Sequence, residues 1–363
     1  MSKVRRLGIL TSGGDCAGLN AAIRAVVHRA VHGYGWLVFG ITDSTLGLMN
    51  RPLEYQELTP AICNHSMLQM GGTMLGTTNK GDPFAFPMPD GSRKDRTADF
   101  VEGFHQLGLD ALIVIGGDGS LKILNTLCKA GNLPMVGIPK TIDNDVPATE
   151  FSIGYATAVN VVLDALDRLQ PTAASHHRAM ILEVMGRDAG HIALAAGIAG
   201  GADIVLIPEI RYSMKGIVSK IDEVREAGRN HALVVVAEGC QTEGGGSLTH
   251  EQFGGETRYG GVGQYLAHRI GEETEMETRV TVLGHVQRGG QPAMQDRLLA
   301  SVFGVHAVDL VAEGRYDRMV AWQDRGVVDV PIDDVVIGAR GVDPKGPVVQ
   351  TARGLGIYVG EPT

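Results

Sequence analysis

Short, mostly apolar runs alternate along this chain with longer segments whose apolar residues recur at helical spacing. Short continuous apolar runs are typical of strands that are buried on both faces. The expected strands are Leu7–Leu10, Leu37–Ile41, Ala111–Ile115, Met135–Ile138, Met180–Val184, Ile204–Ile207, Leu233–Ala237 and Val280–Leu283. Between them, helical spacing is clearest over 155–169, where Val159, Val162, Leu163 and Leu166 share one face.

Strands that alternate with helices indicate parallel sheets with helices on both faces. The chain has 363 residues, which is long for one hydrophobic core and favours two domains. We therefore predict an α/β protein with two doubly wound α/β/α domains, mainly parallel sheets and crossovers between the domains. Residues 77–97 are expected to form a long loop or excursion, and the stretch after Trp322 is only weakly patterned.

Composition narrows the function classes. The net charge is −9 and no block of lysines and arginines occurs, so neither a nucleic acid nor a membrane surface is an expected partner. The four cysteines lie far apart and form no CxxC pair, which fits a reducing compartment better than a disulfide framework. The N-terminus has no apolar stretch of signal-peptide or membrane-spanning length, so we expect a cytoplasmic protein.

Glycine is the unusual residue, with 50 copies, and several follow the expected strands directly. Thr11-Ser12-Gly13-Gly14-Asp15 follows the first strand, Gly116-Gly117-Asp118-Gly119-Ser120 the third, and Met185-Gly186-Arg187 the fifth. Such junctions let phosphate oxygens approach free N–H groups at helix N-termini. Neither a GxxxxGK[ST] loop nor, at the two N-terminal junctions, a GxGxxG fingerprint is present. A single GGD turn is more often a plain strand-to-helix connection, and the repetition favours phosphate binding.

The segment Pro139-Lys140-Thr141-Ile142-Asp143-Asn144-Asp145 follows another strand. A lysine, a hydroxyl and two carboxylates at one strand end suit phosphoryl transfer. One carboxylate can accept a proton from an attacking hydroxyl, and another near Asp118 can support Mg²⁺. The same residues, taken alone, also suit a turn that caps the next helix.

Together these motifs resemble those of the ATP/pyrophosphate 6-phosphofructokinase family. The matching segments are LTSGGDCAGLNAAIR, GGTMLGTT, IGGDGS, PKTIDND, SHHRAMILEVMGR, AEG and TVLGHVQRGG, in one order over residues 7–290. The resemblance implies transfer of a phosphoryl group to the 1-hydroxyl of fructose 6-phosphate in glycolysis, with Mg²⁺ as cofactor. It also implies a donor-binding domain of residues 1–153 plus 287–337, and a fructose-6-phosphate domain of 154–286 plus 338–363.

The resemblance assigns a role to each matching residue. Asp143 would be the base, Thr141 would contact the transferring phosphoryl group, Arg187 would neutralise its charge, and Lys140 would assist. Asp118 would hold Mg²⁺, with Asp145 supporting the site. The residues expected to bind the donor are Gly14, Lys80, Gly117, Asp118, Gly119 and Ser120.

On the sugar-phosphate side, the resemblance implies that Glu238 binds sugar hydroxyls and that His285 and Arg288 bind the 6-phosphate. The full substrate-binding set is Thr141, Asp143, Arg178, Met185, Gly186, Arg187, Glu238, Arg279, His285 and Arg288. In the family, arginines at the positions of Arg178 and Arg279 reach in from a neighbouring subunit. A homo-oligomer, a dimer or a tetramer, is therefore expected.

Two residues bear on the phosphoryl donor. ATP-using relatives have glycine at the position of Gly119, whereas pyrophosphate users have an aspartate that crowds and repels a nucleotide. Lys140 points the other way, because lysine there is typical of pyrophosphate users. Thr42 and Asn79 replace a tyrosine and an arginine of bacterial ATP-type members, which places the chain in the mixed-substrate branch. We favour ATP, with a reversible pyrophosphate-dependent enzyme as the alternative.

Two other classes of protein share some of these features. A non-catalytic regulatory subunit would be expected to lose an acidic residue in TIDND or GGD, and both motifs are intact. Diacylglycerol-kinase-like and NAD-kinase-like enzymes share the GGDG turn but lack the PKTIDND and HVQRGG segments. We therefore predict a catalytically active kinase.

Overall fold

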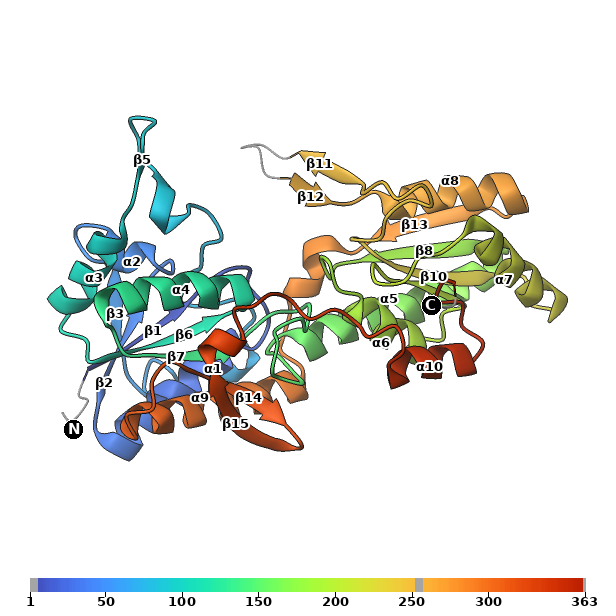
Figure 1. Ribbon diagram of the computed structural model, residues 1–363. Coiled ribbons are helices and arrows are strands. Elements are labelled where there is room, and N and C mark those ends of the chain that lie inside the picture. Colours follow the sequence, from blue (N-terminus) through green and yellow to red (C-terminus); the bar gives the residue numbers. More distant parts are fainter. Residues whose placement is uncertain (1–5, 252–256, 362–363) are drawn as a thin grey trace. The chain divides into compact units, whose positions relative to one another are not determined.

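The computed structural model describes residues 6–251 and 257–361 (Figure 1). The chain forms two compact units. Unit 1 comprises the described residues up to Ile142, together with Val146–Ala156 and Arg288–Ala339. Unit 2 comprises Asp143–Asp145, Thr157–Gln287 and the described residues from Arg340 onward. The short segment Asp143–Asp145 thus belongs to unit 2, although the chain on both sides of it belongs to unit 1.

Unit 1 contains a seven-stranded sheet in the order β15-β14-β7-β6-β1-β2-β3. Its five inner strands run parallel, and the edge strands β3 and β15 run antiparallel to their neighbours. The strands are β1 (Arg6–Thr11), β2 (Leu37–Ile41), β3 (Tyr55–Leu58), β6 (Ala111–Gly116), β7 (Met135–Pro139), β14 (Arg318–Gln323) and β15 (Gly326–Pro331). The helices are α1 (Leu19–His28), α2 (Leu46–Met49), α3 (Thr97–Gln106), α4 (Asp118–Gly131) and α9 (Met294–Ala312).

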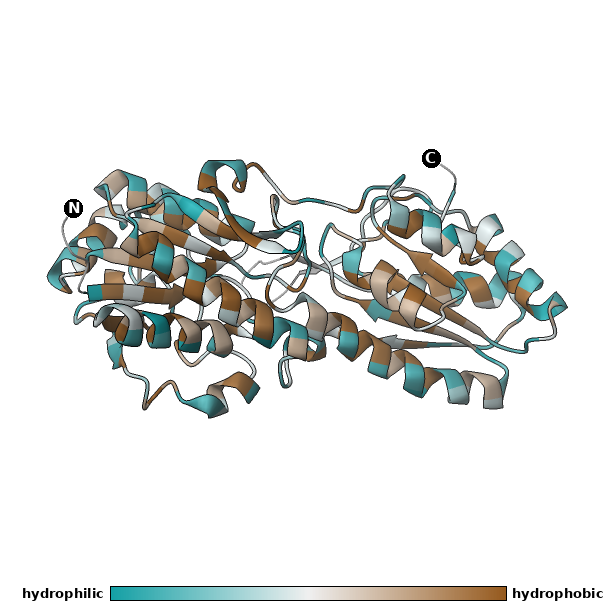
Figure 2. Cartoon of the chain, turned by 90° about the horizontal axis from the view of Figure 1, so that it is seen from below, coloured by the Kyte–Doolittle hydropathy of each residue, from teal (hydrophilic) through white to brown (hydrophobic). Residues whose placement is uncertain are grey.

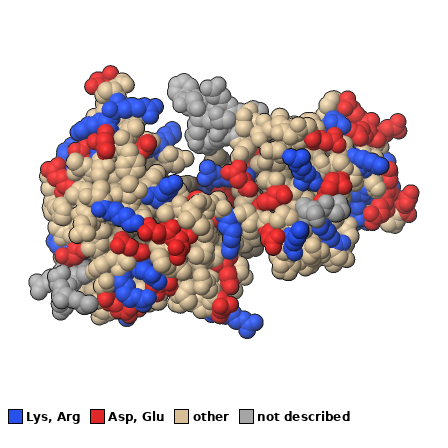
Figure 3. All heavy atoms as spheres, in the orientation of Figure 1, with Lys and Arg blue, Asp and Glu red and all other residues tan. Residues whose placement is uncertain are grey.

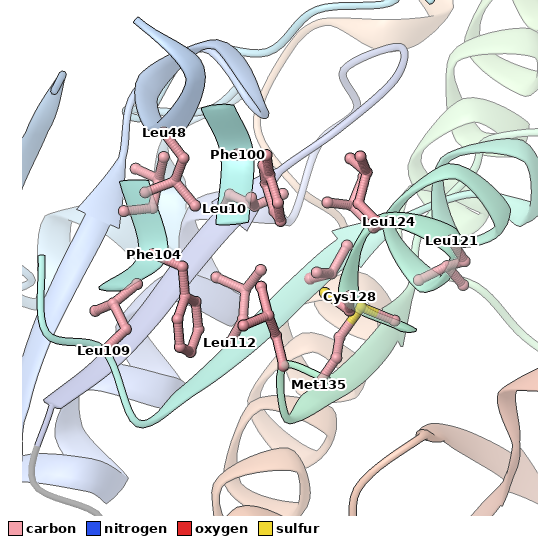
Figure 4. Close-up of a cluster of buried hydrophobic side chains, with 14 of the residues drawn as sticks. Leu10, Leu48, Phe100, Phe104, Leu109, Leu112, Leu121, Leu124, Cys128 and Met135 are labelled. Carbon is pink, nitrogen blue, oxygen red and sulfur yellow. The ribbon is translucent and has the colours of Figure 1, made fainter. Parts of the chain in front are cut away.

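Both faces of this sheet are covered by helices. On one face, Phe100 and Phe104 of α3 and Leu124 of α4 pack with Leu10 and Leu112 of the sheet (Figure 4). Each buried phenylalanine contributes roughly 1.5–3 kcal/mol to folding. On the other face α1 packs closely against α9, where Gly304 lies beside the backbone of α1. The fully buried strands explain why each appears in the sequence as an uninterrupted apolar run.

Unit 2 contains a four-stranded parallel sheet in the order β13-β8-β10-β9. Its strands are β8 (Ala179–Val184), β9 (Ile204–Leu206), β10 (Ala232–Ala237) and β13 (Thr278–Val282). Its helices are α5 (Tyr155–His176, whose first two residues belong to unit 1), α6 (His191–Ala199), α7 (Met214–Glu226), α8 (Val262–Thr274) and α10 (Pro347–Gly354). Figure 1 shows α6 and α8 on opposite sides of this sheet. In Figure 2 the strands of each unit are mostly brown, while teal residues recur along the helices.

The structure confirms the predicted α/β class with mainly parallel sheets, and it corrects three local expectations. Helix α5 continues past Leu169 and through Pro171 to His176, because Ala173 is fully buried beyond the proline. The stretch after Trp322, whose sequence is only weakly patterned, forms β15 and α10. The excursion 77–97 carries a short hairpin of β4 (Phe86–Pro87) and β5 (Arg93–Lys94), which Figure 1 shows projecting from unit 1.

Candidate functional site

The strand order of unit 1 reverses between β1 and β6. From β1 the chain passes through α1 to β2 on one side, and from β6 it passes through α4 to β7 on the other. Thr11 pairs with Ile115 at the carboxyl ends of these two strands, and Ser12 N donates a hydrogen bond to Ile115 O at 2.9 Å. In open parallel sheets, ligands bind at such a reversal of strand order. Both glycine-rich turns of unit 1 therefore leave the sheet at the place where a ligand is expected.

Two cations converge on the first of these turns. The Lys140 ammonium donates a hydrogen bond to the carbonyl of Gly14, and Arg288 Nη1 donates to Asp15 O at 3.0 Å. A Cβ atom on Gly14 would lie 2.8 Å from Arg288 Nη1, so only glycine leaves room for this contact. Lys140 is 3% exposed, so its charge is held inside the protein beside the turn. This arrangement provides positive charge where anionic ligands are expected.

The second turn leads directly into helix α4, whose first residue is Asp118. Gly117 precedes the helix in an extended conformation, and the first N–H groups of the helix point out of its N-terminus. A Cβ atom on Gly119 would meet no heavy atom within 4 Å. A Cβ atom on Gly13, in the first glycine-rich turn, would lie 2.7 Å from Ser120 Oγ in the second, so the two turns are in close contact. A helix N-terminus beside two buried or half-buried cations can bind phosphate groups.

The predicted catalytic segment is divided between the two units. Lys140 N donates to Gly116 O at 3.0 Å, and Thr141 N donates to Ile153 O at 3.1 Å, which ties both residues to unit 1. The next residues, Asp143–Asp145, pack with unit 2. Asp143 is 4% exposed. The candidate base is thus held by the unit that also carries Glu238.

In unit 2 the turn after β8 is held against the end of β10. Arg187 N donates to Glu238 Oε1 at 3.2 Å, and Glu238 N donates to Val184 O at 2.8 Å. Arg187 has φ +52°, a left-handed conformation that only a tightly constrained turn imposes on arginine. A Cβ on Gly239 would lie 1.9 Å from Arg187 O, so glycine is required at that position. The turn Met185–Arg187 and the residue Glu238 therefore lie together at the carboxyl ends of β8 and β10.

Glu238 is a half-buried carboxyl group with a raised pKa. Burial is the main cause, and the charges of Asp143 and Glu183 add to it, whereas the N–H groups of Arg187 and Gly186 oppose it. Asp143 and Glu238 both belong to unit 2, and the charge of Asp143 contributes to the raised pKa of Glu238. A half-buried carboxyl group with a raised pKa is suited to bind the hydroxyl groups of a ligand.

Comparisons with known proteins agree with this geometry. The sequence profile of the family described as phosphofructokinase matches residues 6–311. The chain is 60% identical over 366 residues to ATP-dependent 6-phosphofructokinase 1 of Nostoc sp. PCC 7120, which covers 99% of this chain and 100% of the relative. It is 59% identical over 360 residues to ATP-dependent 6-phosphofructokinase 1 of Synechocystis sp. PCC 6803, with 99% of each covered. The chain belongs to the phosphofructokinase family.

A solved structure shows the same family fold. Pichia pastoris phosphofructokinase in the T-state superposes with a TM-score of 0.80 at 31% identity. The match covers 98% of the present chain and 37% of that longer chain. The resemblance inferred from the motifs is thereby confirmed at the level of both sequence and fold.

The two arginines expected at a subunit interface meet at one acidic residue. Arg178 Nε donates to Glu277 Oε2 at 2.7 Å, and Arg279 also forms an ion pair with Glu277. These ion pairs lower the pKa of Glu277, with the hydrogen bond from Arg178 as the main cause. Strands β8 and β13 pair in register, which places both arginines at the amino-terminal edge of the sheet. This edge is opposite to the one that carries Met185–Arg187 and Glu238.

Arg288 and His285, expected to bind the same phosphate, differ in their surroundings. His285 is exposed and lies in the short helix Gly284–Arg288 of the HVQRGG segment. Arg288 is the first residue of its segment of unit 1 and contacts the GGD turn. Gln287, which lies between them in the sequence, is not among the predicted site residues. Its side chain is 1% exposed and accepts a hydrogen bond from Met185 N at 2.8 Å, which ties this helix to the turn after β8. Its place inside the matching HVQRGG segment was the signal that the sequence offered.

The residues around Asp118 fit a magnesium ion better than a metal held by protein alone. Among the described residues, no group of three or more His, Cys, Asp or Glu side chains converges to hold a metal. Asp118 supplies one half-exposed carboxylate at the second glycine-rich turn, as the first residue of α4. Mg²⁺ is commonly held by one or two carboxylates together with substrate phosphates and water. The donor set therefore suits Mg²⁺ that arrives with a polyphosphate.

Lys80 is exposed in the excursion, where its backbone N–H donates to Thr78 Oγ1 at 3.1 Å. On the face that Figure 3 shows, acidic and basic side chains are interspersed over each unit. In the part of the chain that the structure describes, no helix combines the length and apolar composition needed to cross a bilayer.

Proposed function

We propose that this protein transfers the terminal phosphoryl group of Mg-ATP to the 1-hydroxyl of fructose 6-phosphate, yielding fructose 1,6-bisphosphate in glycolysis. The carrying observation is that Asp143 belongs to unit 2 together with Glu238, whereas Lys140 and Thr141 of the same motif stay with the glycine-rich turns of unit 1. The names of the Nostoc and Synechocystis relatives, both ATP-dependent 6-phosphofructokinases, support the same reaction and donor.

Unit 1 is proposed to bind the donor. The N-terminus of α4 and the buried Lys140 offer positive charge to phosphate groups, and the glycines allow their close approach. Mg²⁺, bound by Asp118 with Asp145 supporting the site, would neutralise charge on the donor phosphates. The proposed donor-binding residues are Gly14, Lys80, Gly117, Asp118, Gly119 and Ser120.

The sugar phosphate is proposed to bind at Arg187 and Glu238 of unit 2, and Asp143 of the same unit is proposed to be the base. Asp143 accepts the proton of the 1-hydroxyl as that oxygen attacks, and Thr141 contacts the phosphoryl group in transfer. Arg187 places positive charge where negative charge is redistributed, which is the main catalytic contribution available in phosphoryl transfer. Glu238 binds sugar hydroxyls. His285 and Arg288 bind the 6-phosphate, since the contact with Asp15 uses one of the five N–H donors of Arg288.

We further propose a cytoplasmic homo-oligomer, a dimer or tetramer. Arg178 and Arg279 would act across the subunit interface, and their shared ion pair with Glu277 supports a common orientation for the two side chains. In that arrangement Glu277 holds both guanidinium groups ready for a neighbouring subunit's sugar phosphate. Neither a nucleic acid nor a membrane is a proposed partner.

Pyrophosphate is the second candidate donor, and Lys140 is the observation that favours it. Its ammonium group is buried beside the GGD turn, where it can hold the terminal phosphate of a short donor. Gly119 favours ATP, because nothing within 4 Å of its position fills the space that a nucleotide needs. The open space at Gly119 admits both donors, whereas an aspartate would exclude the larger one, so we assign ATP.

The deciding experiment measures fructose 1,6-bisphosphate formation from fructose 6-phosphate and Mg²⁺, with ATP and pyrophosphate in parallel. Activity with ATP alone, or much higher activity with ATP, is expected. Activity with pyrophosphate alone would overturn the assignment of the donor. Absence of activity with both donors would overturn the proposed reaction and favour a regulatory subunit.

A further inference from the structure

The segment Gly338–Val342, here called the Arg340 segment, returns the chain to unit 2 after the last strand of unit 1. None of the motifs that indicate the family includes it. It nevertheless contacts the candidate base segment Asp143–Asp145 directly. Arg340 N donates to Asp145 O at 2.6 Å, and Arg340 Nη2 lies 3.4 Å from Asn144 O. Both contacts are made to backbone carbonyls, so they fix the path of the chain next to Asp143.

The Arg340 segment is itself anchored to two other parts of unit 2. His191 Nε2, at the start of α6, lies 3.0 Å from Arg340 O. Glu209 Oε1 accepts hydrogen bonds from Val342 N at 2.6 Å and from Gly190 N at 3.0 Å. The Arg340 segment therefore joins three parts of unit 2 in one hydrogen-bond network. They are the loop after β9 that carries Glu209, the N-terminus of α6, and the candidate base segment Asp143–Asp145.

The candidate base segment Asp143–Asp145 has no helical or sheet hydrogen bonds to define its conformation. Asn144 has φ +53°, in the left-handed region, and residues 143–145 lie in neither a helix nor a strand. Their flanks are held in unit 1 by the bonds at Thr141 and Ile153. Contacts within unit 2 therefore help to set the path of this loop. Arg340 supplies two of them, one through its backbone N–H and one through its guanidinium group.

We infer that Arg340 is a positioning residue that holds Asp143 in the orientation needed to take the proton of the acceptor hydroxyl. This inference rests on the proposed function. The His191 ring holds the Arg340 carbonyl in place. Burial lowers the pKa of His191, so the ring is neutral near neutral pH and can donate a hydrogen bond to that carbonyl. Arg340 itself is not assigned any contact with a substrate.

The test compares Arg340→Met, Arg340→Lys and a matched control. Methionine keeps an unbranched stem but removes the guanidinium donors, and lysine restores one donor group and the charge. Arg353→Met is the control, because Arg353 Nη2 also donates to a backbone carbonyl of unit 2, that of Glu361 at 3.2 Å, away from Asp143. Arg340→Met should lower kcat about tenfold or more, since small misplacement of a catalytic group is costly. The KM for fructose 6-phosphate should change less than about threefold, because Arg340 is not assigned to substrate binding.

Partial recovery of kcat in Arg340→Lys and an unchanged kcat in Arg353→Met would support a positioning role. If Arg340→Met does not fold, His191→Asn provides the same test, because it removes the support of the Arg340 carbonyl and should lower kcat in the same direction. A kcat near the wild-type value in the variants that fold would overturn the inference. So would a rise in KM that accounts for the whole loss of kcat/KM.

Hydrogen–deuterium exchange separates this inference from the proposed reaction. Amides of a peptide covering residues 140–150 should exchange faster in Arg340→Met than in the wild type or in Arg353→Met, all without substrate. Unchanged exchange of these amides would show that the Arg340 side chain does not hold the loop. Faster exchange in a protein whose wild type forms no fructose 1,6-bisphosphate would refute the proposed reaction and leave the structural contact standing.

Discussion

The choice of phosphoryl donor can be tested at Gly119 with little risk to the fold. The residue is exposed at the second position of α4, its φ is ordinary, and a Cβ atom there would meet no heavy atom within 4 Å. Replacement by aspartate removes the entropic cost of a helical glycine and places a negative charge at the positive end of the helix. The stability of Gly119→Asp should therefore equal or exceed that of the wild type, by up to about 1 kcal/mol.

The same change should strongly disfavour ATP. If the new carboxylate lies about 5 Å from one unit of phosphate charge at an effective dielectric constant near 20, the repulsion is about 3 kcal/mol. That energy corresponds to roughly a hundredfold loss of kcat/KM for ATP. Pyrophosphate carries no nucleotide in this position, so its use should fall less or should increase relative to ATP.

The assay compares kcat/KM for ATP and pyrophosphate, at saturating fructose 6-phosphate, in the wild type and three variants. Gly119→Asn has nearly the same size without the charge and separates steric crowding from repulsion. Gly354→Asp adds the same charge at an open position of α10 and controls for net charge. A fall in ATP use of less than about threefold in a folded Gly119→Asp protein would refute the assignment of Gly119 as the donor-selecting residue.

Three further substitutions test the remaining parts of the site. Asp143→Asn should lower kcat by several orders of magnitude with little change in thermal stability or in fructose 6-phosphate binding, measured by calorimetry; near-normal turnover would remove Asp143 from the role of base. Gly14→Ala should displace Arg288, since the new methyl would lie 2.8 Å from Nη1, and should weaken sugar-phosphate binding about tenfold or more in the same titration. For Glu238, whose folded pKa is raised above 4.5, the carboxyl stabilises the fold most below that pH and loses this contribution as pH rises through the raised pKa. The melting temperature of the wild type should therefore fall relative to that of Glu238→Gln as pH increases over this range. If the melting temperatures of the two proteins change in parallel with pH, the raised pKa of Glu238 is contradicted.

Local sequence pattern was sufficient for the strands that lie inside a sheet, because those strands are buried on both faces. Ala111–Ile115 and Leu233–Ala237 are uninterrupted apolar runs, and the structure confirms them as parts of β6 and β10. The pattern was insufficient at Pro171, where burial of Ala173 keeps α5 helical beyond a residue that usually ends a helix. Tertiary packing overrides local propensity at such places.

The position of the glycine-rich turns was also predictable from sequence, because strand ends and helix starts place adjacent residues at one edge of a sheet. Contacts between residues that are far apart in sequence could not be predicted in this way. Nothing in the order of residues indicates that Arg288 would reach the carbonyl of Asp15, or that Arg340 would bind the backbone beside Asp143. Those contacts depend on how helices and loops pack around each sheet.

The amino-acid sequence by itself therefore determined the fold class, the family and the residue types available for catalysis, since these follow from periodicity and from motifs of adjacent residues. Only the tertiary structure decided which unit holds each part of the catalytic segment. Lys140 and Thr141 stay with unit 1 through strand-like hydrogen bonds, whereas Asp143–Asp145 pack with unit 2. The physical reason is that the backbone groups of this short irregular loop find their partners in a segment almost two hundred residues away, and that partnership has no local signal in the sequence.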